Sequence, residues 1–160
     1  MNKGIEYNTL DNLTADEVIS LFSLSPLPME GGFYRQTIKT KHYSAIYYLV
    51  KPESFSAFHR LSFDEVWHFY AGDPAIQMQL LPGGEVKLFK LGRSTDNSRL
   101  PQLLSPAHCW QATRLVPGGR WALFGTTMAP PYSEDDYQHG DSDILISKYP
   151  AYEQQIKEFI

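Results

Sequence analysis

Hydrophobic positions along the chain follow two spacings, one helical and one strand-like. Over residues 15–24 the apolar side chains recur at helical spacing, and residues 14–17 have the Ser/Thr-x-x-Glu form of a capping box. This pattern predicts one amphipathic helix, stopped by the prolines that follow it. From residue 33 onward, short runs rich in aromatic and β-branched residues predict strands. The predicted strands cover residues 33–38, 45–50, 56–60, 66–71, 76–81, 85–91, 109–115 and 120–128.

Turn residues separate these runs at regular intervals. Pro82-Gly83-Gly84 and Pro117-Gly118-Gly119 each predict a hairpin between the strands on either side. Many short strands joined by such turns are typical of an all-β sandwich or barrel. Residues 142–160 mix polar and apolar positions and predict a short C-terminal helical tail. The chain shows no repeat and no linker, so we expect a single domain over residues 1–160 with its core at about 30–130.

Composition narrows the classes of function. With 14 basic and 18 acidic residues among 160, the formal net charge is −4, so the chain lacks the broad basic surface of nucleic-acid-binding proteins. The single cysteine, Cys109, excludes an intrachain disulfide and favours a reducing compartment. No apolar run is long enough for a transmembrane helix, and the N-terminus has no apolar signal-peptide core. We therefore expect a cytoplasmic protein that binds neither membrane nor nucleic acid.

Residues 59–72, HRLSFDEVWHFYAG, concentrate groups that carry chemistry in other proteins. Because side chains alternate across a strand, Glu65, Trp67 and Phe69 are expected on one face. A short turn before this strand predicts a hairpin that places His59 opposite that face. Such a histidine and glutamate can ligate a metal or act as acid and base, and they can equally be a buried structural pair. The spacing leaves these interpretations open.

Two glutamines and one arginine extend the predicted pocket. Gln77 and Gln79 share one face of their strand, and if that face is inward their amides suit a polyol or sugar. The alternate apolar positions, such as Met78, would then pack in an inter-sheet or dimer contact. An inward Arg35 would need an anionic partner, either Glu65 or an acidic ligand.

Two further candidates are expected near the mouth of the barrel or sandwich. Glu30 precedes Gly31 and Gly32, which allow a tight backbone turn into the first long strand. The acidic loop of residues 133–137 could fold over the mouth and make Tyr132 or Tyr137 a candidate acid. For both segments, an ordinary surface turn is the alternative.

Several motifs resemble those of the cupin superfamily. His59-x-Leu61-x3-Glu65-x6-Gly72 resembles the first cupin motif, and residues 106–111 stand where the second motif is expected. The phrases EGGFYR and DEVWHFYAG resemble the cupin-5 group of small cupins of unknown function. The resemblance covers residues 21–150 and implies a jelly-roll barrel, commonly a homodimer, with a ligand site inside the barrel mouth. It extends more distantly to the sugar-nucleotide epimerase cupins, which work without metal and use a histidine base.

The chain departs from the metal-binding cupin motif at two positions. That motif would have histidine where this chain has Leu61 and Gln111. A metal, if present, would have His59, Glu65 and the weak amide ligand Gln111, which falls short of a typical transition-metal site. We therefore expect no cofactor.

Three hypotheses for function remain open. In the first, the barrel binds a small polar molecule and acts as a metal-independent isomerase or epimerase on a sugar-like or carbonyl compound. His59 would then be the base, Glu65 its orienting partner and Arg35 an anion anchor. The second is a metal-dependent dioxygenase or isomerase with a reduced ligand set, and the third is a non-catalytic binding protein. The rest of the predicted ligand site consists of Glu30, Trp67, Phe69, Gln77, Gln79, Gln111 and Tyr137.

Overall fold

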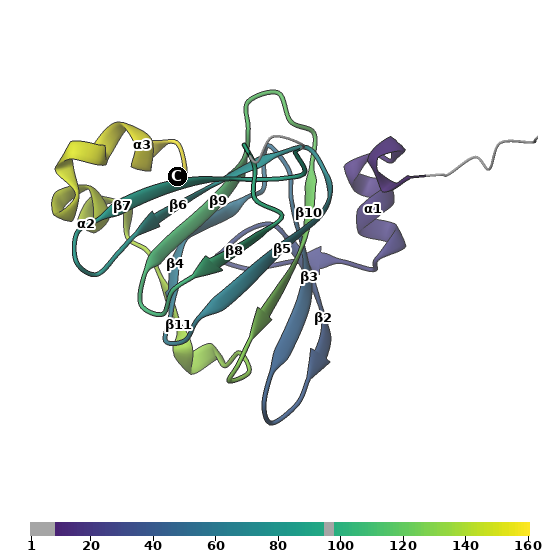
Figure 1. The fold of residues 1–160 in the computed structure, drawn as a ribbon, viewed down its shortest axis with the longest axis horizontal. Helices are drawn as coiled ribbons and strands as arrows, with labels where there is room; N and C mark the ends of the chain where they lie inside the picture. The colour runs from purple at the N-terminus through teal and green to yellow at the C-terminus, as the bar shows by residue number, and fades with distance from the viewer. Residues whose placement is uncertain (1–8, 95–97) are drawn as a thin grey trace, which may run out of the picture.

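In the computed structural model, which describes residues 9–94 and 98–160, two antiparallel sheets face each other (Figure 1). The first sheet has the spatial order β1 (Ser25–Pro26), β2 (Phe33–Lys39), β3 (Ser44–Val50), β10 (Ala122–Met128), β5 (Glu65–Gly72) and β8 (Gln102–Ser105). The second has the order β11 (Tyr137–His139), β4 (Ser56–Leu61), β9 (Trp110–Leu115), β6 (Ala75–Leu80) and β7 (Val86–Leu91). This is the all-β jelly-roll architecture that the strand pattern and the motifs predict.

Of the two hairpins predicted from Pro-Gly-Gly turns, the one at residues 82–84 is confirmed. Strands β6 and β7 pair along their whole length, and the turn between them is closed by a bond from the Leu81 amide to the Glu85 carbonyl oxygen at 2.8 Å. Gly84 has a φ of +90° in this turn, a conformation that glycine adopts without steric cost.

The other predicted hairpin, at residues 117–119, is wrong. Strand β9 pairs with β4 and β6, whereas β10 pairs with β3 and β5 in the opposite sheet. The turn is held instead at the corner between β5 and β6, where the Val116 amide bonds to the Pro74 carbonyl oxygen at 3.0 Å and the Arg120 amide bonds to Asp73 at 2.7 Å. Turn residues specify a change of direction but not the strand that the chain meets next.

The predicted hairpin between the strands of His59 and Glu65 is also wrong. Strands β4 and β5 lie in different sheets, and the chain crosses between the sheets after Leu61. The two side chains nevertheless both reach the interior, because each strand turns the relevant face toward the opposite sheet. The strands β1, β8 and β11 were not predicted, since each has only two to four residues and carries little periodic signal.

The space between the sheets changes character along its length. Toward one end it is filled by aromatic and aliphatic side chains, among which Phe124 packs edge-to-face on Trp67 and Phe69. Toward the other end, the next inward residues on the same two strands are Thr126 and Glu65, which line a cavity. The hydrophobic end provides the rigid wall on which the polar end is built.

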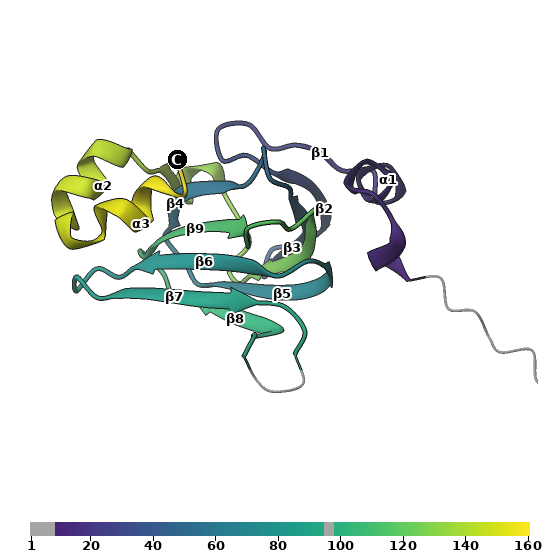
Figure 2. The same cartoon turned by 90° about the horizontal axis from the view of Figure 1, so that it is seen from above.

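Helices cover the outer faces of both sheets (Figure 2). The helix α1 (Ala15–Leu21), preceded by the short turn η1 (Leu10–Asn12), packs against the first sheet through Val18. A complete capping box between Thr14 and Glu17 starts α1 as predicted. It ends at Leu21, before the predicted residue 24, because Ser23 has a φ of +52°.

The C-terminal segment is helical, as predicted, and it covers the second sheet. It consists of α2 (Ser142–Lys148), η3 (Pro150–Tyr152) and α3 (Glu153–Lys157). Leu145, Ile156 and Phe159 pack on Met78 and Leu80 of β6. The apolar face of β6 is therefore buried by this chain's own helices, and the predicted inter-sheet or dimer contact for these residues is wrong. Over the described parts of the chain, no helix has the length and apolar character needed to cross a membrane.

Candidate functional site

A cavity of about 950 Å³ opens between the two sheets at their polar end. Its lining includes five residues of the sequence-predicted site: Glu30, His59, Glu65, Trp67 and Tyr137. The segment η2 (Glu134–Asp136) lies at this cavity just before β11, as expected for the acidic loop. A cavity of this volume matches those that hold small organic molecules.

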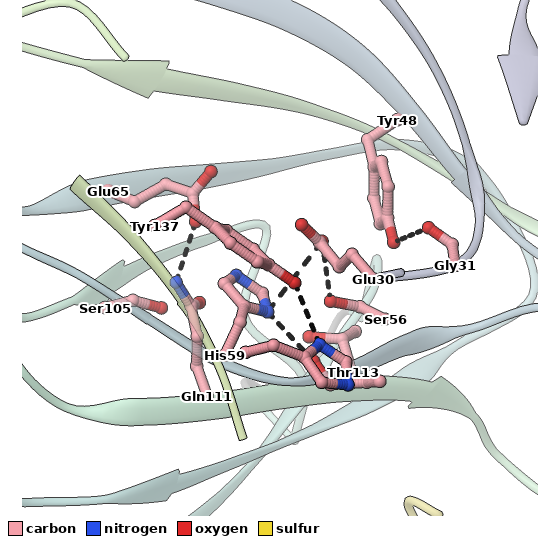
Figure 3. Close-up of polar contacts among 12 residues, drawn as sticks. Glu30, Gly31, Tyr48, Ser56, His59, Glu65, Ser105, Gln111, Thr113 and Tyr137 are labelled. Carbon is pink, nitrogen blue, oxygen red and sulfur yellow. Dashed lines mark hydrogen bonds and ion pairs between the residues drawn. The ribbon is translucent and has the colours of Figure 1, made fainter. Parts of the chain in front are cut away.

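His59 is held in one orientation within this cavity (Figure 3). Its side chain is buried, and its Nδ1 lies 2.9 Å from the carbonyl oxygen of Ala57. A carbonyl oxygen only accepts hydrogen bonds, so Nδ1 carries a proton and Nε2 is the ring nitrogen available to a ligand. The Tyr137 ring stacks on the imidazole with centroids 5.5 Å apart and planes 17° apart, and its hydroxyl lies 3.1 Å from His139 Nδ1.

Glu65 is held by a closed set of hydrogen bonds. Its Oε2 accepts from Trp67 Nε1 at 3.1 Å and from Gln111 Nε2 at 2.8 Å, and Trp67 Nε1 also donates to Gln111 Oε1 at 3.0 Å. These bonds make Gln111 a support for Glu65 from behind the cavity wall. In the described part of the chain, no hydrogen bond or ion pair joins Glu65 to His59. The predicted role of Glu65 as the partner that orients His59 is therefore wrong.

Glu30 is the carboxylate that stands beside His59. Its Oε1 lies 3.9 Å from His59 Nδ1 and accepts a hydrogen bond of 3.0 Å from the Ser56 hydroxyl. A register shift in the pairing of β4 with β9 lets both Ser56 and His59 face inward although they are an odd number of residues apart.

The glycine after Glu30 permits this placement. Gly31 has a φ of +92°, and a Cβ there would come within 2.3 Å of the Phe55 carbonyl oxygen. Any other residue at position 31 would therefore displace the turn that carries Glu30 into the cavity.

The environment of Glu30 disfavours its charged form. Burial raises the pKa of Glu30; the nearby His59 opposes this shift, and the negative charge of Glu65 adds to it. The folded protein therefore holds a proton on Glu30 more tightly than an unfolded chain does.

Glu30→Gln is expected to flatten the pH dependence of stability. The contribution of a raised carboxyl pKa is fully present below the unfolded value of 4.5 and is lost as the pH rises through the folded value. Thermal unfolding measured from about pH 4 to about pH 8 should therefore show the wild type losing stability relative to Glu30→Gln. Glu85→Gln, which changes an exposed carboxyl, is the control and should follow the wild type. Parallel curves for the wild type and Glu30→Gln would contradict the raised pKa.

Three tyrosines that line the cavity hold their protons strongly. Burial raises the pKa of Tyr48 well above its usual value, and burial together with Glu30 raises the pKa of Tyr132 to about 12. Burial likewise raises the pKa of Tyr137. All three are neutral phenols at physiological pH, and the Tyr48 hydroxyl already donates to the Gly31 carbonyl oxygen at 2.7 Å.

Two lining tyrosines, Tyr34 and Tyr48, were missed by the sequence analysis. Tyr34 and Gln36 are two residues apart on β2 and share the face that lines the cavity. The motif EGGFYR contains Tyr34, but the strand has no alternation of apolar and polar residues that would show which face points inward.

Arg35 lies on the opposite face of β2 from these residues. It is exposed, and its guanidinium lies over the Tyr47 ring, 5.5 Å from the centroid. The predicted inward orientation of Arg35 is wrong, and with it the predicted anion anchor. The strand is too exposed for its hydrophobic pattern to define the inner face.

Phe69, Gln77 and Gln79 face inward as expected but lie outside the cavity. Phe69 packs on Phe124 with ring centroids 5.6 Å apart. Gln79 Nε2 donates to Gln77 Oε1 at 2.7 Å, and Gln77 Nε2 donates to Thr113 at 3.1 Å. Their amide groups form hydrogen bonds within the protein, so these two glutamines support the cavity wall from behind.

The residues of this cavity do not fit a tightly bound metal ion. The Oε1 atom of Gln111, the third ligand of the reduced set, already accepts from Trp67. Among the residues that the structure describes, no three His, Cys, Asp or Glu side chains are grouped so that they could hold an ion. A histidine and a separately anchored glutamate are fewer ligands than such a site requires.

Residues 16–140 match the model of the family Cupin_5, which is also called DUF985 and belongs to the cupin superfamily. The chain belongs to this family. It is 26% identical over 115 residues to the uncharacterized protein YML079W of Saccharomyces cerevisiae, a match that covers 69% of this chain. The matched region spans 57% of the yeast protein, a little over half of its length.

Solved structures of similar proteins share the fold over nearly the whole chain. Protein SO0799 from Shewanella oneidensis has a TM-score of 0.85 and 28% identity, covering 92% of this chain and 97% of its own. A hypothetical protein from Leishmania major has a TM-score of 0.85 and 26% identity, covering 92% and 98%. Oxalate decarboxylase from Bacillus subtilis, at 13% identity and a TM-score of 0.58, covers 97% of this chain and 41% of its own, and shows the cupin fold alone.

Proposed function

We propose that this cupin binds a small polar molecule in the cavity and isomerises or epimerises it without a metal. The observation that carries the proposal is the orientation of His59. With Nδ1 engaged by the Ala57 carbonyl oxygen, Nε2 is a lone-pair acceptor on a side chain that lines the cavity. In an isomerisation such a base removes a proton from the carbon next to a carbonyl group and returns it to the former carbonyl carbon. In an epimerisation the base keeps that proton, and a neutral phenol or water delivers another to the opposite face of the same carbon.

Neighbouring groups support proton transfer at His59. The positive imidazolium that forms when Nε2 takes the proton favours the ionised form of Glu30, whose Oε1 is 3.9 Å from Nδ1, and the carboxylate in turn stabilises the imidazolium. The phenols of Tyr132 and Tyr137 can donate a hydrogen bond to the oxygen of the resulting enolate. Glu65, anchored by Trp67 and Gln111, then serves as a fixed contact for a polar group of the ligand.

Hydrogen–deuterium exchange tests the proposal without knowledge of the overall reaction. The protein is incubated in D2O with aldoses, ketoses, amino sugars, sugar nucleotides and small keto acids, and NMR follows the protons next to the carbonyl. We expect at least one compound to exchange faster with the protein than without it. Binding of compounds without any exchange would instead favour a non-catalytic binding protein, the third hypothesis.

Metal removal is expected to leave this exchange unchanged. Untagged protein, analysed for metal and protein in the same sample, should contain far less than one iron, manganese, nickel or zinc ion per chain. Dialysis against EDTA should not slow the exchange, because the ligand set around His59 is incomplete. Near-stoichiometric metal whose removal stops the exchange would establish the metal-dependent alternative.

A further inference from the structure

The charges that line the cavity are unbalanced. Four carboxyl side chains line it: Glu30, Glu65, Glu134 and Asp135. Among the described residues that line the cavity there is one lysine, Lys39 at the exposed end of β2, and no arginine. Even with His59 protonated, negative groups outnumber positive ones. A phosphorylated or carboxylated ligand would therefore enter against the charge of the site.

The two inner carboxyl groups face the same space. Figure 3 shows Glu30 and Glu65 extending toward each other from opposite sides, and the charge of Glu65 disfavours ionisation of Glu30. Glu65 is 7% exposed and uses Oε2 for both of its hydrogen bonds. Within the described residues its Oε1 has no donor, and it is not among the fully buried polar atoms that lack a partner, so it is accessible from the cavity. A donor supplied by a ligand would complete this carboxylate and relieve its repulsion with Glu30.

The wall also carries aromatic side chains among aliphatic and small polar ones. Its rings belong to Tyr34, Tyr48, Trp67, Tyr132 and Tyr137. The face of an aromatic ring attracts a cation, and this attraction grows when the cation is removed from water. Two carboxyl groups and aromatic side chains around one space are the chemistry that recognises an ammonium group.

We propose that the cavity selects a small organic cation, an amine or quaternary ammonium compound, held between Glu30 and Glu65 against the aromatic wall. The inference rests on the proposed function in one respect, that this cavity is the ligand site. It replaces an acidic ligand, for which an inward Arg35 was expected, with a ligand of opposite charge. For the proton transfer at His59, the corresponding substrates are amino sugars and amino ketones.

Three probes of nearly the same shape test the sign of the charge. Choline, 3,3-dimethylbutan-1-ol and 3,3-dimethylbutanoate carry a positive, a zero and a negative charge. Each is titrated into the full-length protein, and shifts of the His59 and Trp67 side-chain NMR signals report binding in the cavity. Choline is expected to bind about tenfold more tightly than the alcohol, and the butanoate more weakly than either.

Isosteric variants identify the groups that cause the preference. Glu30→Gln and Glu65→Gln should each weaken choline binding by about tenfold and leave the alcohol unchanged, while Glu85→Gln on the β6–β7 turn should leave both unchanged. Thermal unfolding of the variants establishes that they are folded. Added salt should weaken choline binding and not alcohol binding.

The outcomes separate the two proposals. Equal binding of choline and the alcohol, or tighter binding of the butanoate, would overturn the cation preference while keeping the cavity as a ligand site. If no probe shifts the His59 and Trp67 signals and no compound exchanges in D2O, both the preference and the proposed function are wrong.

Discussion

Trp67→Ala is expected to lower the free energy of unfolding by about 3–5 kcal/mol. The Trp67 side chain is 1% exposed and packs edge-to-face on Tyr48 and Phe124, with ring centroids 5.6 and 5.3 Å away. Its Nε1 also donates to Glu65 and Gln111, so the substitution leaves the buried Gln111 Oε1 without a donor and removes one of the two donors of Glu65 Oε2. Urea unfolding followed by circular dichroism measures the change.

Trp67→Phe separates the two contributions in that prediction. It keeps an aromatic ring at the boundary between core and cavity but removes the donor, so the expected loss is smaller, about 1–3 kcal/mol. Ligand binding should fall in both variants, because Glu65 loses one of the bonds that fix it. Equal stability of the wild type and Trp67→Ala would show that this tryptophan does not hold the two sheets together.

His59→Ala is expected to slow the deuterium exchange by about 10²- to 10⁴-fold, the range found when a general base is removed. The fold should remain, because His59 borders a cavity that water can fill and its hydrogen bond to Ala57 is local. The exchange rate and the thermal unfolding midpoint are measured on the same preparations.

His68→Ala is the matched control for this variant. His68 lies on β5 with its ring bonded to Gln102 and Thr127, outside the cavity. The control should exchange at the wild-type rate. Full activity in His59→Ala would rule out His59 as the base, and an equal loss in both variants would point to a general effect on the fold.

Residues that alternate along strongly apolar strands were assigned correctly from the sequence. On β5, Glu65, Trp67 and Phe69 all face the interior, and on β6 the same holds for Gln77 and Gln79. On β5 only the inward face is wholly buried, so a shift of one residue would expose the core and one orientation is stable. On β6 both faces are buried, one by the opposite sheet and the other by the C-terminal helices. On the exposed strand β2 no such constraint exists, and the predicted orientation of Arg35 failed there.

Partners distant along the chain were beyond reach of the sequence. Glu30 approaches His59 through a glycine turn and through a register shift in β4 that also turns Ser56 inward. Gln111 approaches Glu65 from the opposite sheet. Neither contact leaves a periodic signal, because hydrophobic periodicity reports which face of an element is buried and not what it is buried against.

The sequence by itself determined most of the strands that carry the site, the capped helix at the N-terminus and the motifs of a cupin. These are local properties, set by side-chain alternation, capping and turn chemistry. Only the tertiary structure decided that β4 and β5 lie in opposite sheets, that Glu30 replaces Glu65 beside His59, and that the cavity is acidic and aromatic. Those features depend on how two sheets close over each other, which is set by the burial of both inner faces together and not by any one segment.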